Sequence, residues 1–221
     1  ACSAKMSIAR IYYTRLDEPD KAFPYVDDVI KNNPLSLYAE EAYLWEGLIY
    51  QRNEEWEKSA EIYEVVLKKF PNAVSNDRAR ALLAGNYVRL KNYKKAIEQY
   101  EIVSKSKNNK LAEESSYYIG SIYCNYIKNL PKAQQSLEKF VAKYPNSTYV
   151  KRANEIIERC KAKKQQDKAF KAYDKKMKKE KEAEIKEMEQ TILLEDAANM
   201  EKISKEYKRA IDYYKNDKYN E

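Results

Sequence analysis

The chain has 221 residues, of which 35% are charged and only 3 are glycine, and it contains no histidine. Three glycines are too few for a phosphate-binding loop, and the missing histidine removes the most common metal ligand and general base. We therefore expect no catalytic residue, no metal site and no cofactor. The low glycine and proline content favours helices joined by short polar turns, which predicts an all-α fold.

The formal net charge of +7 is unevenly distributed along the chain. Residues 161–181 contain ten lysines against three acidic residues, whereas residues 182–221 contain seven basic against eleven acidic residues. A basic run followed by an acidic one is typical of solvated helix faces, so we do not expect nucleic-acid binding. No apolar run approaches the roughly 20 residues of a membrane span, so membrane contact is expected only through a lipid anchor.

The first three residues, Ala1-Cys2-Ser3, match the end of a bacterial lipobox, in which a small residue precedes the lipidated cysteine. Two interpretations stay open. In one, Cys2 is the lipidation site of a mature lipoprotein; in the other, a cysteine stands near this position by chance.

A pattern of 37 residues recurs along the chain from its beginning to about residue 160. A fixed period of this length is the signature of a solenoid of stacked helical units. Its markers are Pro34, Pro71, Asn108 and Pro145, and, twelve residues before each, Ala22, Ser59, Ala96 and Ala133.

The second unit predicts two helices, over about residues 37–52 and 56–69. Gly47 marks a close approach of the partner helix, residues 53–55 form the turn, and Pro71 ends the second helix. The first and fourth units have the same scheme with one extra residue in the turn, and Ser36 and Ser147 are plausible N-caps of the helices that follow.

The second unit resembles the tetratricopeptide repeat (TPR), whose small, aromatic and proline positions are matched by Gly47, Tyr50, Ser59, Tyr63 and Pro71. The resemblance implies a right-handed superhelical solenoid of antiparallel helix pairs over residues 1–160, with four repeats and the start of a fifth. The three residues beyond the usual 34 lie in the junction after the proline. This longer junction is similar to that of bacterial envelope TPR proteins, both the lipoprotein of the outer-membrane β-barrel assembly machinery and the Tol-Pal-associated protein.

Residues 161–221 depart from the 37-residue pattern and predict long charged helices. They could form a degenerate repeat, a cap that covers the end of the solenoid, or a coiled-coil or partner-binding helix. A stripe at helical spacing supports the last interpretation: Ile185, Met188, Ile192, Met200 and Ile203.

Two further cysteines, Cys124 and Cys160, are almost one repeat apart. Neighbouring helix axes lie about 8–10 Å apart, which is farther than a disulfide usually spans, so buried free thiols are the expected state and a bridge is the alternative.

The resemblance implies that a partner binds on the concave face, which the first helix of each repeat lines. Three of the arginines there, Arg10, Arg52 and Arg89, form a row that suits an acidic or C-terminal peptide. The expected partner-binding residues are Arg10, Tyr13, Leu44, Leu48, Gln51, Arg52, Arg78, Val88, Arg89, Tyr117, Ser121 and Asn125.

The sequence therefore favours a non-enzymatic adaptor of the bacterial cell envelope. In this interpretation it is periplasmic, anchored to the outer membrane through Cys2, and binds components of a β-barrel assembly or envelope complex. Two alternatives remain open: a cytoplasmic TPR regulatory or helper protein, and an accessory subunit of a larger enzyme complex.

Overall fold

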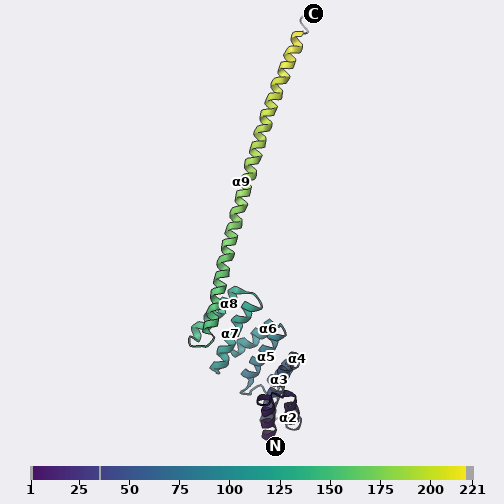
Figure 1. The fold of residues 1–221 in the computed structure, drawn as a ribbon, viewed down its shortest axis with the longest axis vertical. Coiled ribbons are helices and arrows are strands. Elements are labelled where there is room, and N and C mark those ends of the chain that lie inside the picture. The colour runs from purple at the N-terminus through teal and green to yellow at the C-terminus, as the bar shows by residue number, and fades with distance from the viewer. Residues whose placement is uncertain (1, 35, 218–221) are drawn as a thin grey trace. The chain divides into compact units, whose positions relative to one another are not determined.

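The computed structural model describes residues 2–34 and 36–217, and within these ranges it contains nine α-helices and no strand (Figure 1). By its internal contacts, the chain divides into two units, residues 1–162 and 163–221. The helices are α1 (Cys2–Thr14), α2 (Pro19–Asn32), α3 (Leu37–Arg52), α4 (Trp56–Lys69), α5 (Asn76–Arg89), α6 (Tyr93–Val103), α7 (Asn109–Asn125), α8 (Leu130–Lys143) and α9 (Val150–Asp217).

The first eight helices form four consecutive pairs, and the pairs stack on one another. In each pair the first helix, called helix A, packs against the second, helix B, and helix B also contacts helix A of the next pair. Successive A helices meet as well, α1 with α3 and α5 with α7. The all-α solenoid is thus confirmed, and α3 and α4 have the bounds that the sequence predicts.

Small residues on the A helices let the paired B helix approach closely. A Cβ atom on Gly47 would lie 2.5 Å from Tyr63 Cε1, and one on Gly120 would lie 2.5 Å from Leu137 Cγ. Gly85 differs, because its Cβ would meet only the Tyr100 hydroxyl, at 3.9 Å. The predicted close approach at Gly47 is therefore confirmed, and it depends on an aromatic ring.

The turn within each pair contains one residue in the left-handed region of φ, and these residues follow the 37-residue period. All four are non-glycine, with φ between 56° and 61°. The residue directly after each left-handed residue donates its backbone N–H to a tyrosine carbonyl near the end of helix A. Glu55 donates to Tyr50 at 2.9 Å, and Asn92 donates to Tyr87 at 2.8 Å. The left-handed residues are Asp17, Glu54, Lys91 and Lys128.

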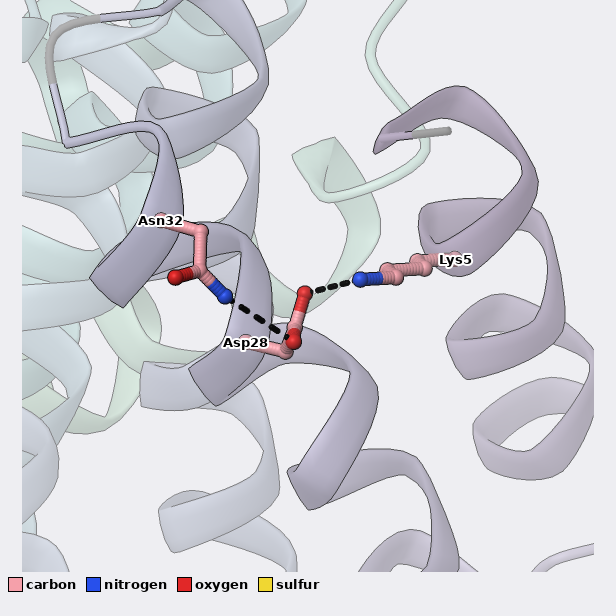
Figure 2. A network of polar contacts seen from close by, with 3 residues as sticks. All are labelled: Lys5, Asp28 and Asn32. Carbon is pink, nitrogen blue, oxygen red and sulfur yellow. Dashed lines mark hydrogen bonds and ion pairs between the residues drawn. The ribbon is translucent and has the colours of Figure 1, made fainter.

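A small polar network joins the first helix pair on its surface (Figure 2). The Asp28 carboxylate on α2 forms an ion pair with Lys5 on α1 and accepts a hydrogen bond from Asn32 Nδ2 at 3.0 Å. Both charged side chains are more than one-third exposed, so the pair contributes at most about 1 kcal/mol to stability.

The junctions between repeats are tied together by serine hydroxyls. Ser36 caps α3, as predicted, by accepting the Ala39 N–H at 3.1 Å. The N-cap prediction for Ser147 is wrong, because α9 begins only at Val150 and the Ser147 hydroxyl donates instead to Glu113 of the previous repeat at 2.5 Å. The junction serine therefore links two repeats there.

Helix α9 runs without interruption from Val150 to Asp217. Its first turns complete the solenoid core, since Ala153, Ile157 and Cys160 are buried. A degenerate fifth repeat would need a turn and a second helix, so that interpretation of residues 161–221 is wrong. Beyond residue 162, every side chain described is exposed except the half-buried Met177. The cap and the coiled coil remain predictions.

Cys124 and Cys160 lie in one buried cluster as free thiols. Burial and then the neighbouring Cys124 raise the pKa of the Cys160 thiol, and Arg159 Nη2 lies 3.0 Å from Cys124 Sγ. Among the residues that the structure describes, no helix has the length and apolar character of a membrane span.

Candidate functional site

The A helices place the predicted partner-binding residues at very different depths. Leu44 and Tyr117 are each only 7% exposed and belong to the core, which corrects the prediction that they are available to a partner. Tyr117 is covered from the next repeat, where Tyr149 stacks on it with ring centroids 4.6 Å apart. The sequence register identified their helix face but could not show that a neighbouring repeat covers it.

Gln51 takes part in a buried hydrogen-bond network between the second and third repeats. Its Nε2 donates to Asn86 Oδ1 at 2.5 Å, and Asn86 Nδ2 donates to Ser59 Oγ at 2.8 Å. Ser59 Oγ donates in turn to the Gly47 carbonyl at 2.7 Å. Because Asn86 and Ser59 are fully buried, this network stabilises the stacking of two repeats, and Gln51 is already occupied.

Two of the three arginines in the predicted row are also engaged within the chain. Arg52 forms an ion pair with Asp17 of the preceding repeat, and the Arg89 guanidinium lies over the Trp56 ring, 5.1 Å from its centroid. Both arginines remain exposed. Each of these interactions holds its arginine in place.

The remaining predicted residues line the same helix faces with varied exposure. Arg10, Arg78 and Asn125 are exposed, and Asn125 Oδ1 accepts a hydrogen bond from Arg159 at 3.3 Å. Tyr13 donates its hydroxyl to the Leu48 carbonyl at 3.3 Å, and burial raises its pKa. The half-buried members of the set are Tyr13, Leu48, Gln51, Val88 and Ser121.

A groove between α5 and α7 brings one of these residues, Arg78, together with apolar side chains. The deeper part of the groove has a volume of about 240 Å³, and Tyr100 of α6 is among the residues that line it. Arg78 and Glu114 both line it, from equivalent positions of successive repeats. The deeper part is lined by Arg78, Ala81, Leu82, Tyr100, Leu111, Glu114, Ser115 and Tyr118.

The groove widens toward the junction loops that precede α5 and α7. This outer part has a volume of about 720 Å³ and shares Arg78, Leu111 and Glu114 with the deeper part. Val74 lies there and its side chain is fully exposed. Together, the two parts form what we call the α5–α7 groove. The outer part adds Glu40, Val74, Ser75, Asp77, Ser106, Lys107, Asn108 and Lys110.

The charged side chains of the α5–α7 groove do not pair with one another in the part of the chain that the structure describes. Two of its carboxylates are engaged by serines, Glu40 by Ser75 and Asp77 by Ser106. Within residues 2–34 and 36–217, no salt bridge involves Arg78 or the nearby Lys107 and Lys110. These cations are therefore available to an acidic ligand.

Two residues that line the α5–α7 groove, Tyr100 of α6 and Tyr118 of α7, belong to a group of stacked tyrosines. Tyr100 and Tyr118 stack with ring centroids 5.5 Å apart, and Tyr118 also contacts Tyr149 at 6.2 Å. Burial raises the pKa of Tyr100, and that of Tyr149 to about 12, so these two phenols stay neutral at physiological pH. Tyr118 is 38% exposed, which leaves part of its ring accessible to an apolar side chain.

Several groove residues were missed by sequence reasoning. Val74, Leu111 and Tyr118 stand outside the TPR register positions from which the concave face was predicted. Glu114 is at such a position, equivalent to Arg78 one repeat earlier, and that equivalence could have identified it. Val74 had no such signal, because single apolar residues are common at protein surfaces.

The comparisons with known proteins agree with this architecture. The family model described as tetratricopeptide repeat matches residues 41–73 and 114–147. No curated protein is similar enough in sequence to count as a relative. The chain therefore carries TPR repeats, and proteins built from them generally mediate protein–protein interactions.

Solved structures with a similar fold include three proteins of low sequence identity. The MamA protein has a TM-score of 0.60 at 20% identity, covering 77% of this chain and 86% of MamA. The TPR-like repeats of a putative kinesin light chain from Podosopora anserina have a TM-score of 0.59 at 16% identity, covering 76% of this chain and 90% of that one. A TPR protein from Parabacteroides merdae has a TM-score of 0.61 at 15% identity, covering 73% of this chain and 60% of that protein. At these identities the likeness shows the fold alone.

Proposed function

We propose that this protein is a non-enzymatic adaptor that binds an acidic peptide segment of a partner protein in the α5–α7 groove. The observation that carries the proposal is the combination, in one groove, of exposed apolar surface with three cations that form no salt bridge among the described residues. A carboxylate of the peptide would bind Arg78, because a guanidinium can donate two parallel hydrogen bonds to it. An apolar side chain beside that carboxylate would pack on Val74, Leu111 and Tyr118.

The test compares capture of partners by two charge-reversal variants of the full chain. Arg78→Glu places a repelling charge in the groove and should lower partner recovery about tenfold, since a charge-assisted contact is replaced by repulsion. Lys94→Glu makes the same charge change at an exposed position of α6 outside the groove and should leave recovery unchanged. Quantitative mass spectrometry of the captured proteins reads out both variants. Equal recovery with Arg78→Glu and wild type would refute the proposal.

A bacterial envelope location is part of the same proposal. It is supported by the long junctions between repeats and by the Ala1-Cys2-Ser3 sequence, with Cys2 as the lipid-anchored residue and envelope assembly proteins as partners. Cys2 is the first residue of α1 and lies half-buried against the core of the first helix pair, which includes Met6, Ala9 and Val26. Intact-mass measurement of the native protein tests this point. A mass increase that maps to Cys2 supports the anchor, and an unmodified thiol at Cys2 contradicts it.

A further inference from the structure

The part of α9 beyond residue 162 carries an apolar stripe that no other described element covers. Phe170, Tyr173, Met200 and Tyr207 are 69%, 62%, 68% and 68% exposed. Large apolar side chains left so open along one helix are unusual in a soluble protein unless they contact a partner. The other exposed apolar residues of the stripe are Ile185, Met188, Ile203 and Ile211.

The stripe repeats with a period of about 11 residues, which corresponds to about 3.67 residues per turn. Met177 and Met188 are one such period apart, as are Met200 and Ile211, and Phe170 and Ile203 are three such periods apart. With this period the stripe stays on one side of a helix that supercoils with a right hand. From Phe170 to Tyr207 it is about 56 Å long, which is ample for a two-stranded coiled coil.

The charged residues on this side of the helix include Asp174, Lys178, Lys181, Glu189 and Asp196. Asp174 and Lys178 pair with each other within the helix, and the spacing of Lys181 and Asp196 carries the argument. Lys181 lies one period after Phe170, and Asp196 lies one period before Tyr207. In an antiparallel pair of identical helices that places Met177 opposite Met200, Lys181 falls opposite Asp196 and Phe170 opposite Tyr207. In a parallel pair, each charged residue would instead face its own copy, lysine on lysine and aspartate on aspartate.

The other ion pairs of the helix leave these two residues out. Between residues 163 and 213, the salt bridges along α9 are formed by Lys163, Lys176, Lys178 and Lys205 with acidic residues of the same helix. Lys181 and Asp196 take part in none of them. They are therefore available to pair with each other between two chains.

From this charge complementarity we infer that residues 163–213 bind a second copy of the chain as an antiparallel two-stranded coiled coil. The apolar stripe supplies the buried seam, and two symmetric Lys181–Asp196 pairs fix its orientation and register. A charged residue in such a seam selects orientation at a cost in stability, so the dimer should be reversible. This inference concerns α9 and does not depend on peptide binding in the α5–α7 groove.

Sedimentation velocity of the full chain over a concentration series tests the inference. The wild type should show a reversible monomer–dimer equilibrium. Lys181→Asp and Asp196→Lys should each weaken the dimer about tenfold or more, because two attractive pairs become repulsive ones. The double variant Lys181→Asp/Asp196→Lys should return to within about threefold of wild type, since the two pairs are restored with exchanged charges.

Lys179→Asp is the matched control, because it makes the same charge change about 200° around the helix from Lys181. It should change the dissociation constant by no more than about threefold. A wild-type chain that stays monomeric over the series would overturn the inference. This holds even if that monomeric chain binds lipid vesicles or another protein. A double variant as weak as the single ones would also overturn it, because the antiparallel register requires recovery.

Discussion

Gly47 offers the sharpest test of how the repeats are packed. In Gly47→Ala, the added Cβ would lie 2.5 Å from Tyr63 Cε1 and 2.6 Å from Tyr63 Cζ, about 1 Å inside normal carbon contact. Alanine gains about 1 kcal/mol over glycine in a helix, but overpacking a core costs about 1–3 kcal/mol or more. Because Tyr63 is fully buried, we expect a net loss of about 2 kcal/mol in unfolding free energy.

Thermal unfolding followed by circular dichroism measures this loss. For a chain of this length, about 2 kcal/mol corresponds to a decrease in Tm of about 4–8 °C. Gly85→Ala is the control, since its Cβ would meet only Tyr100 at 3.9 Å, and it should raise the unfolding free energy by about 0.5–1 kcal/mol. If Gly47→Ala raises Tm as Gly85→Ala does, the packing argument is wrong.

The first repeat suggests a compensating change, because it has Ala9 and Val26 at the positions of Gly47 and Tyr63. Tyr63→Val alone should cost about 2–4 kcal/mol through the cavity that it leaves. Gly47→Ala/Tyr63→Val should cost no more than Tyr63→Val alone, because the added methyl group no longer meets a ring. Simple addition of the two single losses would show that these residues do not interact.

Three further predictions address the turns, the buried network and pH. Lys91→Gly should raise the unfolding free energy by about 1 kcal/mol, because Lys91 has a φ of 59° that glycine adopts without strain; a loss of thermal stability would contradict this. Asn86→Ala should lower it by about 2 kcal/mol in urea unfolding, because the buried Ser59 and the half-buried Gln51 lose this hydrogen-bond partner; a loss below about 0.5 kcal/mol would refute that role. Burial, and then the Asp27 carboxylate, raise the pKa of Glu46 from 4.5 to about 7. The folded state therefore binds an extra proton between these values, so stability should fall as pH rises through that window. Glu46→Gln should flatten this dependence of Tm, and parallel curves for variant and wild type would be the contrary result.

The helix pairs could be predicted from sequence because their signals are local. Gly47 and Pro71 mark the close approach and the end of a helix, so α3 and α4 were predicted to the residue. The left-handed turns could not be predicted in the same way. The residues there, such as Glu54 and Lys91, are ones that rarely adopt positive φ, and the hydrogen bonds of the turn, including those to the tyrosine carbonyls, stabilise that conformation.

The candidate site was harder to predict because it depends on contacts between repeats. The register placed Tyr117 on the face of helix A, but Tyr149 from the following repeat covers it. It also placed Arg52 in an open row, but Asp17 of the preceding repeat pairs with it. The α5–α7 groove depends on the distance between two A helices and on the course of the junction before each of them. Neither quantity follows from the period of the sequence.

Site-specific photo-crosslinking tests the central proposal, peptide binding in the α5–α7 groove, most directly. A photoreactive phenylalanine analogue replaces Val74, which is fully exposed at the groove, or Ile102, which is 46% exposed on α6 outside it. Both full-length variants are irradiated in native cell extract, and the adducts are identified by mass spectrometry. Our account predicts a partner adduct from position 74 that is lost when Arg78→Glu is added, and none from position 102. Adducts of equal yield from both positions, or an adduct at 74 that is insensitive to Arg78→Glu, would contradict it.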